Sequence, residues 1–586
     1  MANMAKIRLL DPDTVNKIAA GEVIERPASV AKELIENSID AGASRIRIEV
    51  VEGGKRLIRV TDDGCGIEKE DVVLAFQKHA TSKILGAEDL DRIDTLGFRG
   101  EALSSIASVA RSVEVHTKVR SSDLAAGGVR LWIEDGKVAE KTEVGCPAGM
   151  TIEVRDLFYG MPARRKYLKS ARAELARITD VVTSYAIINP QIAFDLFTGK
   201  RTIFKSVRSE GWDDCILRIL GTEVARNLVP VKAESGQMTI SGVVGRRSLT
   251  RSGPDWIMVY VNGRAVRSRV LTRAVTEAYR TLIPSGRYPI AMISLEIDPA
   301  LVDVNVHPTK KEVRFLREED VAGAVVEAVS RVLLVKDVEA SDGQMKALKT
   351  DKGTGREDNG RPDPGPVVDQ DAQRTLPLTS GAESRLELDL SSGTEKTRLR
   401  VLGQVLKLYI VAEGTEGLVL VDQHAAAERV RYEHLKKMHA ARTLSQELIA
   451  PINLELSPKE QLMLEDWNEL LARMGFEIHP FGGKTYNVRS LPAIGTRLED
   501  PQSVHDVLRD LFAMGKVSCG STSEDDVLKL LACRGSIKAG CEMTWKEMHD
   551  LLKDLFTCQN PKTCPHGRPT VVTISSAQLE KIFGRR

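Results

Sequence analysis

The chain has 586 residues, of which 42% are hydrophobic and 28% are charged, and its formal net charge is +1. This length exceeds what one hydrophobic core usually spans, so we expect about two or three globular units. No run approaches the roughly 18 uncharged apolar residues of a membrane helix, and the first residues lack the apolar stretch and cleavage site of a secretion signal. Eight cysteines without a regular spacing suit a reducing compartment, so we expect a soluble cytoplasmic protein with no membrane partner.

The N-terminal part of the chain mixes helical and strand periodicity. Helical spacing over residues 30–41 is followed by strand alternation over residues 45–50 and 56–63, which indicates an α+β domain over residues 1–211. A second subdomain is predicted over residues 212–337, where strands at 256–263 and 290–297 are separated by a helix at 271–282.

Residues 338–398 differ in composition from both of their flanks. They are rich in Gly, Pro, Ser and charged residues and contain no Phe, Trp or Tyr. Such a segment cannot bury enough apolar surface to offset the entropy of ordering it, so we predict a disordered linker. The C-terminal half, residues 399–586, opens with an alternating pattern that predicts two strands turning at Glu416-Gly417, and helices follow.

A polar cluster marks the predicted helix at 30–41. Glu33, Asn37 and Asp40 share one face of this helix because they are spaced at four and seven residues. A carboxylate beside a carboxamide suits a nucleotide hydrolase, in which the acid polarises water and the amide oxygen holds a magnesium ion. The alternative interpretation is an ordinary solvated helix face.

Two further clusters favour a nucleotide site. The strand at 56–63 ends at Asp62, which can accept a hydrogen bond from an adenine amino group, while Gly64 and Gly66 let the backbone pass close to a base. A tight turn is the alternative there. Residues 96–103 form a glycine-flanked loop that opens a helix, where free N–H groups and the helix dipole favour phosphate.

These three clusters, with His79 to Lys83 between the second and the third, resemble the GHKL family of ATPases and, in the wording of the motifs, its MutL branch of DNA mismatch-repair proteins. The resemblance implies a GHKL ATP-binding sandwich followed by a transducer subdomain with a ribosomal-protein-S5-like fold. It also implies that Glu33 is the general base, that Asn37 ligates the Mg²⁺ of bound ATP, and that Asp62 reads the adenine.

The same resemblance assigns the rest of the ATP site. It places the following residues in the base pocket and the phosphate lid: Gly64, Gly66, Lys83, Gly97, Arg99, Gly100 and Thr151. A further matching stretch, residues 303–315, supplies Lys310, which the family points at the γ-phosphate from the second subdomain, whereas its neighbour Lys311 is interpreted as a solvated lysine. The chain departs from the family at Gly160 and Met161, which puts only local loop contacts in doubt.

The C-terminal half carries a candidate metal site. His424 and Glu428 are one helical turn apart and follow Asp422 at a strand end, so the three can reach one centre. Cys564 and His566 flank a proline that keeps the chain extended, so both can turn to one ion.

Other residues near these motifs are more ambiguous. Cys533 is a third possible soft ligand or a buried core cysteine, and Glu433 faces away from His424 by periodicity and can pair with Arg429. Thiolate and imidazole suit Zn²⁺, whereas the carboxylates suit Mn²⁺ or Mg²⁺.

The segments that carry these ligands, together with residues 583–585 near the end of the chain, resemble the C-terminal motifs of nuclease-active MutL proteins. The resemblance implies a dimerisation domain that nicks one strand of duplex DNA, with Asp422 and Glu428 in the catalytic site. A closed structural zinc site is the alternative interpretation, because a site with four protein ligands would be inert.

Two segments suggest macromolecular partners. Residues 446–451 look like the peptide with which nuclease-type MutL proteins bind the replication sliding clamp, with Gln446, Leu448, Ile449 and Pro451 as its contacts, or they are a loop entering a strand. A basic cluster in the second subdomain suits DNA phosphates, or it is a solvated helix start; its members are Arg264, Arg267, Arg269 and Arg273.

The resemblance as a whole implies an ATP-gated mismatch-repair endonuclease. ATP would pair the N-terminal halves of a homodimer whose C-terminal halves stay joined, forming a ring around DNA at the nucleoid, licensed by a MutS-type mismatch sensor and the clamp. The alternative is a non-cutting matchmaker with a structural or vacant metal site.

Overall fold

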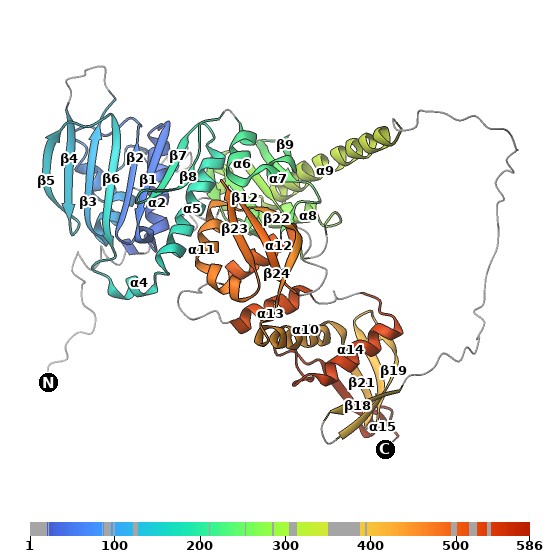
Figure 1. Ribbon diagram of the computed structural model, residues 1–586. Coiled ribbons are helices and arrows are strands. Elements are labelled where there is room, and N and C mark those ends of the chain that lie inside the picture. The colour runs from blue at the N-terminus through green and yellow to red at the C-terminus, as the bar shows by residue number, and fades with distance from the viewer. Residues whose placement is uncertain are drawn as a thin grey trace, which may run out of the picture.

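The computed structural model describes residues 20–21, 23–84, 86, 95–97, 100–120, 127–209, 211–251, 253–283, 286–303, 313–349, 387–392, 395–493, 501–514, 524–535 and 541–585. Within these residues, no helix is both long enough and apolar enough to cross a membrane. The described elements form four lobes, each with its own sheet, and the mixed α+β prediction is confirmed (Figure 1).

The first lobe, residues 20–226, is built on an eight-stranded sheet in the order β5-β4-β3-β6-β2-β1-β7-β8. Its strands are β1 (Arg45–Val51), β2 (Leu57–Asp62), β3 (Ala110–Lys118), β4 (Gly128–Glu134), β5 (Lys137–Val144), β6 (Gly149–Leu157), β7 (Ala193–Thr198) and β8 (Arg201–Lys205). Along β1, buried Ile46, Ile48 and Val50 alternate with more exposed residues, as the two-residue period of a strand requires. This face of the sheet therefore forms part of the core.

Helices complete the first core. They are α2 (Pro27–Asp40), α3 (Ala102–Val109), α4 (Pro162–Tyr167), α5 (Ala171–Ile188), α6 (Trp212–Leu220) and α7 (Thr222–Arg226), with short 3₁₀ turns η1 (Glu52–Gly54) and η2 (Leu74–Phe76). α2 begins with a proline at its first position, where the missing N–H costs no hydrogen bond, and it packs against α5 and β2. α6 starts at Trp212, where the second subdomain was predicted to begin, yet its Cys215, Ile216 and Ile219 are buried in the first core.

The second lobe, residues 228–349, contains a five-stranded sheet in the order β13-β12-β15-β10-β9. The strands of this lobe are β9 (Leu228–Ser235), β10 (Met238–Gly245), β11 (Thr250–Arg251), β12 (Ile257–Val261), β13 (Arg264–Val266), β14 (Tyr288–Pro289), β15 (Ala291–Ile297), β16 (Val302–Asp303) and β17 (Arg314–Phe315). β11 with β14 and β16 with β17 form separate two-stranded sheets of this lobe. Its helices are η4 (Pro254–Trp256), α8 (Arg269–Ala278), η5 (Pro299–Leu301) and α9 (Glu318–Lys349). α8 and α9 pack against each other and against strands of this sheet, which encloses a second core.

The third lobe, residues 444–535, has a three-stranded sheet in the order β22-β24-β23. Its elements are β22 (Ser445–Glu455), α11 (Pro458–Arg473), β23 (Glu477–Gly482), β24 (Thr485–Pro492), α12 (Pro501–Ala513) and α13 (Glu524–Gly535). α11 starts with a capping box, in which Ser457 and Glu460 satisfy each other's backbone N–H groups. The core of this lobe centres on the fully buried Trp467.

The fourth lobe has a five-stranded sheet in the order β18-β19-β20-β21-β25. Its elements are β18 (Glu387–Ser392), β19 (Glu395–Val405), β20 (Tyr409–Gly414), β21 (Gly417–Asp422), α10 (Gln423–Ala440), α14 (Trp545–Thr557), β25 (Val571–Ser575) and α15 (Ser576–Ile582). β20 and β21 pair antiparallel with Gly414 opposite Gly417, so the predicted pair of strands is confirmed, and its turn residues are Thr415 and Glu416, one position before the predicted Glu416-Gly417. α10 joins two lobes, because Ala426 belongs to the fourth core and Leu435 to the third.

The segment predicted as a linker, 338–398, overlaps regular structure at both ends. α9 runs through Lys349, while β18 and β19 start at Glu387 and Glu395. Residues 350–386 lie outside the described residues.

Candidate functional site

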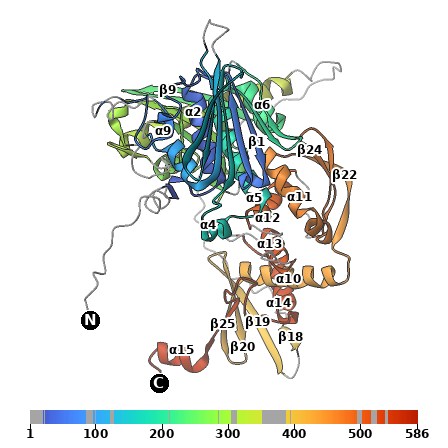
Figure 2. The same cartoon turned by 90° about the vertical axis from the view of Figure 1, so that its left-hand side faces the viewer.

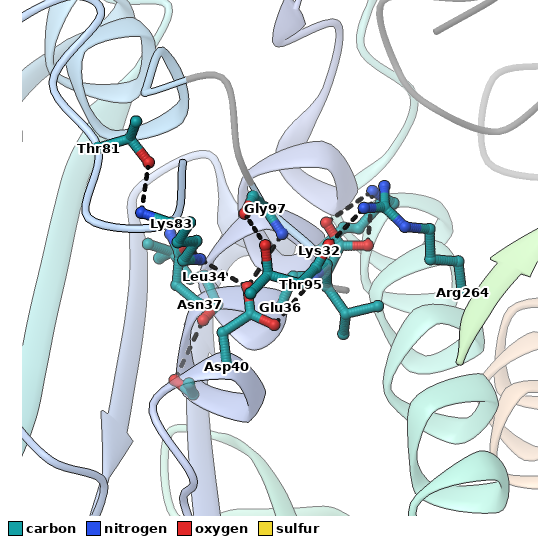
Figure 3. Close-up of polar contacts among 12 residues, drawn as sticks. Lys32, Leu34, Glu36, Asn37, Asp40, Thr81, Lys83, Thr95, Gly97 and Arg264 are labelled. Atoms are coloured by element: carbon teal, nitrogen blue, oxygen red, sulfur yellow. Dashed lines mark hydrogen bonds and ion pairs between the residues drawn. The ribbon is translucent and has the colours of Figure 1, made fainter. Parts of the chain in front are cut away.

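One face of α2 meets two loop segments of the first lobe. Lys83 Nζ donates to Asn37 Oδ1 at 3.0 Å and lies 2.5 Å from Asp40 Oδ2. The backbone N–H groups of Leu96 and Gly97 each donate to the Asp40 carboxylate at 2.9 Å (Figure 3). Asp40 therefore contacts both loop segments, the one that carries Lys83 and the one at residues 96–97. It lies three residues after Asn37, the predicted magnesium ligand, on the same helix.

Two glycines let these loops come close. A Cβ added at Gly97 would lie 3.0 Å from Lys83 Nζ and 3.3 Å from Asn37 Oδ1. Gly100 has a φ of 63°, and a Cβ there would lie 2.6 Å from the Ala80 carbonyl oxygen. The other predicted lid residues, Arg99 and Lys310, lie outside the described residues.

Glu33, the predicted general base, lies in a buried polar network on α2. Lys32 Nζ is 3.4 Å from Glu33 Oε1 and 2.9 Å from Glu36 Oε1, and all three side chains are at most 10% exposed. Burial alone would lower the pKa of Lys32, but the two carboxylates outweigh it and raise the pKa. Tyr185 on α5 donates its hydroxyl hydrogen to Glu36. Lys32 and Tyr185 thus both bind Glu36. The ion pair with Glu36 fixes the Lys32 ammonium group, and Glu33 lies beside it.

Asp62, the predicted adenine-reading residue, is 6% exposed at the end of β2. Burial raises the pKa of its carboxyl, opposed by hydrogen bonds from Ser38 Oγ at 2.8 Å and the Gly64 N–H at 3.0 Å. Thr151 on β6 lies opposite Thr61 and donates to its hydroxyl oxygen at 3.1 Å. A Cβ at Gly66, whose φ is 74°, would lie 2.3 Å from the Lys118 carbonyl oxygen, so only glycine fits at this position.

These side chains have complementary chemistry. A buried carboxylate at Glu33, an amide oxygen at Asn37 and an ammonium group at Lys83 are the groups that polarise water, ligate magnesium and neutralise phosphate. The structure brings Glu33, Asn37 and Lys83 together on or above α2, with Asp62 at the end of the adjacent strand β2.

Arg264 departs from its predicted place on a DNA-binding surface. It is 5% exposed on β13 and donates to the Thr95 carbonyl oxygen of the first lobe, next to Gly97 (Figure 3). Burial lowers the pKa of this guanidinium, and Glu36 and Tyr185 are the strongest groups that oppose the shift. A guanidinium enclosed between two lobes cannot reach DNA, so Arg264 leaves the predicted set. The other three members, Arg267, Arg269 and Arg273, are exposed.

A second group of site residues lies at the fourth lobe. One ligand atom each from Glu428, Cys564 and His566 falls within 4.8 Å of the others, a spacing that could hold one metal ion. Glu428 is 3% exposed and Cys564 is 1% exposed. A buried carboxylate beside a buried thiol and an imidazole fits a divalent transition metal such as Zn²⁺ or Mn²⁺.

Two more predicted ligands approach Glu428. His424 Nε2 lies 3.4 Å from Glu428 Oε1, one turn away on α10, and His566 Nδ1 lies 3.5 Å from Oε2. Burial and the hydrogen bond to Glu428 raise the pKa of the Cys533 thiol to about 12. Glu428 is therefore the common neighbour of the predicted ligands from α10, α13 and the segment before β25.

The remaining two carboxylates have structural partners. Asp422 caps α10, because its Oδ1 accepts the N–H groups of His424 and Ala425, each at 2.9 Å. Glu433 accepts the N–H of Gln559 at 2.7 Å and that of Asn560 at 3.2 Å, and lies 3.7 Å from Arg429. Metal ligation by Asp422 stays a prediction. Glu433 stabilises the loop that leads to Cys564, because it accepts two of its backbone N–H groups.

The segment predicted to bind a clamp lies within β22. Its pairing with β24 is irregular between Glu447 and Ile452, so the intervening residues form a bulge. Gln446, Ile449 and Pro451 are exposed, Ile449 completely, while Leu448 packs on the third core.

Lys32, Glu36 and Tyr185 belong to this site, although no sequence motif indicated them. The spacing of Lys32 and Glu36 by four residues on a helix is a usable signal for an ion pair. No local pattern points to Tyr185, because 149 residues separate it from Glu36.

Three family matches cover much of the chain. Residues 22–162 match "Histidine kinase-, DNA gyrase B-, and HSP90-like ATPase", residues 216–334 match "DNA mismatch repair protein, C-terminal domain", and residues 402–543 match "MutL C terminal dimerisation domain".

Similar proteins extend over the whole chain. "DNA mismatch repair protein MutL" of Methanothrix thermoacetophila is 51% identical over 583 residues, covering 100% of both chains. The protein of the same name from Methanoculleus marisnigri is 43% identical over 597 residues, covering 99% of this chain and 100% of its own. Among solved structures, the "Aquifex aeolicus MutL ATPase domain complexed with ADP" is 28% identical with a TM-score of 0.36, covering 47% of this chain and 94% of its own.

Proposed function

The chain belongs to the MutL family of DNA mismatch-repair proteins, and from that premise we propose that it is an ATP-gated endonuclease that nicks duplex DNA during mismatch repair. The first lobe is an ATPase domain of the GHKL type. The observation that carries the endonuclease proposal is the convergence of Glu428, Cys564 and His566 on one small volume.

In the ATPase half, each polar group has a distinct task. Asn37 would ligate the magnesium ion of bound ATP, Lys83 and the Gly97 N–H would contact its phosphates, and Asp62 would accept the adenine amino hydrogen. Glu33 would accept a proton from the attacking water, and the Lys32 ammonium group lies 3.4 Å from its carboxylate. Because Asp40 now holds both Lys83 and the Gly97 N–H, nucleotide binding must compete with these contacts.

In the C-terminal half, Glu428, Cys564 and His566 would hold the ion, with His424, Cys533 and Asp422 as further ligands. A divalent ion supplies Lewis acidity for phosphodiester hydrolysis. Glu428 presents one oxygen toward His424 and the other toward His566, so its carboxylate positions ligands on both sides. A closed structural zinc site is usually made of four Cys or His ligands. The carboxylates in this cluster therefore favour a site with an open coordination position over an inert structural zinc site.

DNA and protein partners would bind away from these two sites. Arg267, Arg269 and Arg273 are exposed at the start of α8 and would contact phosphates independently of sequence. The bulge with the fully exposed Ile449 supports clamp binding, because an apolar side chain held clear of its sheet can enter a partner's pocket. A MutS-type mismatch sensor is the expected licensing partner.

The matched dimerisation domain indicates a homodimer. The fourth lobe agrees with this because exposed apolar side chains lie on its sheet strands and turn; they include Leu402, Val405, Leu406, Tyr409 and Val572.

The decisive experiment measures nicking of supercoiled plasmid by the full-length protein with Mn²⁺, with and without a sliding clamp. The parent should produce open circles, and Glu428→Ala should not, while both stay dimeric in sedimentation. Absence of nicking by the parent under all these conditions would favour the non-cutting matchmaker.

A further inference from the structure

The third lobe lies against the first lobe in two perpendicular views, with α11 beside α5 (Figures 1 and 2), and its α12 contacts the second lobe through side chains. We propose that this contact is a docking surface, with which each chain holds its own third lobe against the junction between its first and second lobes. Here the first lobe is called the ATPase lobe and the second the transducer lobe, and the contact with the third lobe is called the clasp. The contact joins elements that are hundreds of residues apart in the chain.

The ATPase side of the clasp consists of two helices. Arg172 of α5 pairs with Asp466 of α11, and Asp180 pairs with Lys459 at 2.7 Å. Because the partner numbers fall along α11 as they rise along α5, the two helices run antiparallel. Arg172 and Asp180 are eight positions apart, which is about 12 Å along a helix, and Lys459 and Asp466 are seven positions apart, which is about 10.5 Å, so the charges are in register.

An apolar contact fills the space between these ion pairs. Leu462 lies on α11 between Lys459 and Asp466, is 4% exposed, and belongs to the core of the ATPase lobe. Asp180 and Lys459 are themselves 48% and 42% exposed, so the buried Leu462 is the centre of this contact and the ion pairs lie at its solvent-exposed edge.

A third charge pair lies at the edge of the ATPase sheet. Arg201 of β8 contacts both carboxylate oxygens of Glu465, one of them at 3.0 Å. The hydrogen bond to Glu465 raises the pKa of Arg201, and the same bond lowers the pKa of Glu465. Two-pronged pairing requires the two groups to be held coplanar, which implies a preferred geometry rather than diffuse attraction.

The transducer side of the clasp is α12. Gln502, Asp506 and Arg509 are spaced at four and seven residues, which puts them on one face of that helix. Gln502 accepts from Arg251 at 2.9 Å and donates to the Thr250 carbonyl oxygen at 3.0 Å.

Two arginines and one aromatic ring complete that side. Arg287 pairs with Asp506. The guanidinium groups of Arg251 and Arg509, one from each side of the junction, lie 5.9 Å and 5.7 Å from the centre of the Trp256 ring. A cavity at this junction, lined by Arg251 and Gln502 among others, has a volume of about 10 Å³, which is no larger than one water molecule needs.

The clasp has a mechanical consequence. The third lobe contacts both the ATPase lobe, through α11, and the transducer lobe, through α12, so docking holds these two lobes at one relative position. α10 and α13 then connect the clasp to the metal cluster around Glu428. Because both partners belong to one chain, their effective concentration is on the order of millimolar, and weak ion pairs suffice to keep them together.

The test uses full-length dimers without nucleotide, measured by small-angle scattering and sedimentation velocity. Arg172→Glu with Arg201→Glu reverses one side of the clasp, Glu465→Arg with Asp466→Arg reverses the other, and the fourfold variant restores opposite charges. The matched control is Arg331→Glu, which breaks an exposed ion pair with Glu327 inside α9.

Each double variant should increase the radius of gyration and lower the sedimentation coefficient, and the fourfold variant should return both to the parent values. The parent should expand at about 0.5 M salt, where surface charges are screened. Unchanged dimensions in the double variants, or no recovery in the fourfold variant, would overturn the clasp. None of these residues lies in the ATP site, so loss of ATP binding in the parent would contradict the proposed function without bearing on docking.

Discussion

Lys83 Nζ lies within hydrogen-bonding distance of both Asp40 Oδ2, at 2.5 Å, and Asn37 Oδ1, at 3.0 Å. The lysine predicted to contact ATP phosphates is therefore held by the helix that carries the predicted magnesium ligand. An anionic phosphate that enters this site would compete with the Asp40 carboxylate for Lys83. Binding of nucleotide and ordering of the loops around it are thus coupled through Asp40.

The first prediction separates binding from hydrolysis in the ATPase lobe. Glu33→Ala should bind ATP normally and hydrolyse it about 100-fold or more slowly, because a general base acts on the transition state. Asn37→Ala should lose both, since it removes the magnesium ligand and a partner of Lys83. Equilibrium dialysis with ATP and phosphate release measure the two steps, and hydrolysis by Glu33→Ala at the parent rate would refute the assigned base.

The second prediction concerns Arg264, which connects the transducer lobe to the loop at Thr95. Arg264→Met should lower ATP turnover about 10-fold or more, because it removes the hydrogen bond that holds the Thr95 carbonyl oxygen beside Gly97. Arg264→Lys should recover part of the loss, since one ammonium N–H can still reach Thr95. The control is Arg269→Met, an exposed residue of the same segment, which should keep the parent rate. Equal rates for Arg264→Met and Arg269→Met would show that the bridge has no role in turnover.

The third prediction distinguishes two buried glutamates on α10. Glu428→Ala should abolish Mn²⁺-dependent nicking and leave the thermal midpoint near that of the parent. Glu433→Ala should instead lower the midpoint, because it leaves the N–H groups of Gln559 and Asn560 unpaired at a cost of about 1–3 kcal/mol. Chelator should remove nicking from the parent, and excess Mn²⁺ should restore it. If Glu428→Ala nicks like the parent, the metal site lies elsewhere.

The fourth prediction is a pH dependence set by Lys484, which lies beside Glu455 and near Cys215 of α6. Burial lowers the pKa of Lys484 from 10.5 to about 8, and Glu455 only partly opposes this. The unfolded chain therefore holds the proton at pH values where the folded chain has lost it, and the free energy of unfolding rises between about pH 8 and 10.5.

Lys484→Met should abolish this rise and, at pH 7, stabilise the protein by about 1 kcal/mol, after allowing for solvent screening of a partly exposed group. Calorimetry at pH 7 and pH 9.5 measures the difference between parent and variant. The control is Lys546→Met, which replaces an exposed lysine on α14. A parent midpoint that falls relative to Lys484→Met as the pH rises would contradict the sign.

Local sequence determined much of this protein. The alternation of Ile46, Ile48 and Val50 predicted a strand, the spacing of Glu33, Asn37 and Asp40 predicted a shared helix face, and Glu416-Gly417 predicted a turn between two strands. Each of these depends on interactions within a few residues, where periodicity and glycine conformation are decisive. The candidate ligands Glu428, Cys564 and His566 were also named from motifs, although 136 residues separate Glu428 from Cys564.

Only the tertiary structure decided which charges became buried and what they contact. Arg264 belongs to a basic stretch of sequence that is typical of a protein surface, yet it is buried at the junction of two lobes, where it donates to Thr95. The pairing of Tyr185 with Glu36 and of Arg201 with Glu465 likewise joins residues that share no local pattern. The reason is physical: a charge is stabilised by partners that approach through space, and their identity depends on how whole lobes pack rather than on neighbours along the chain.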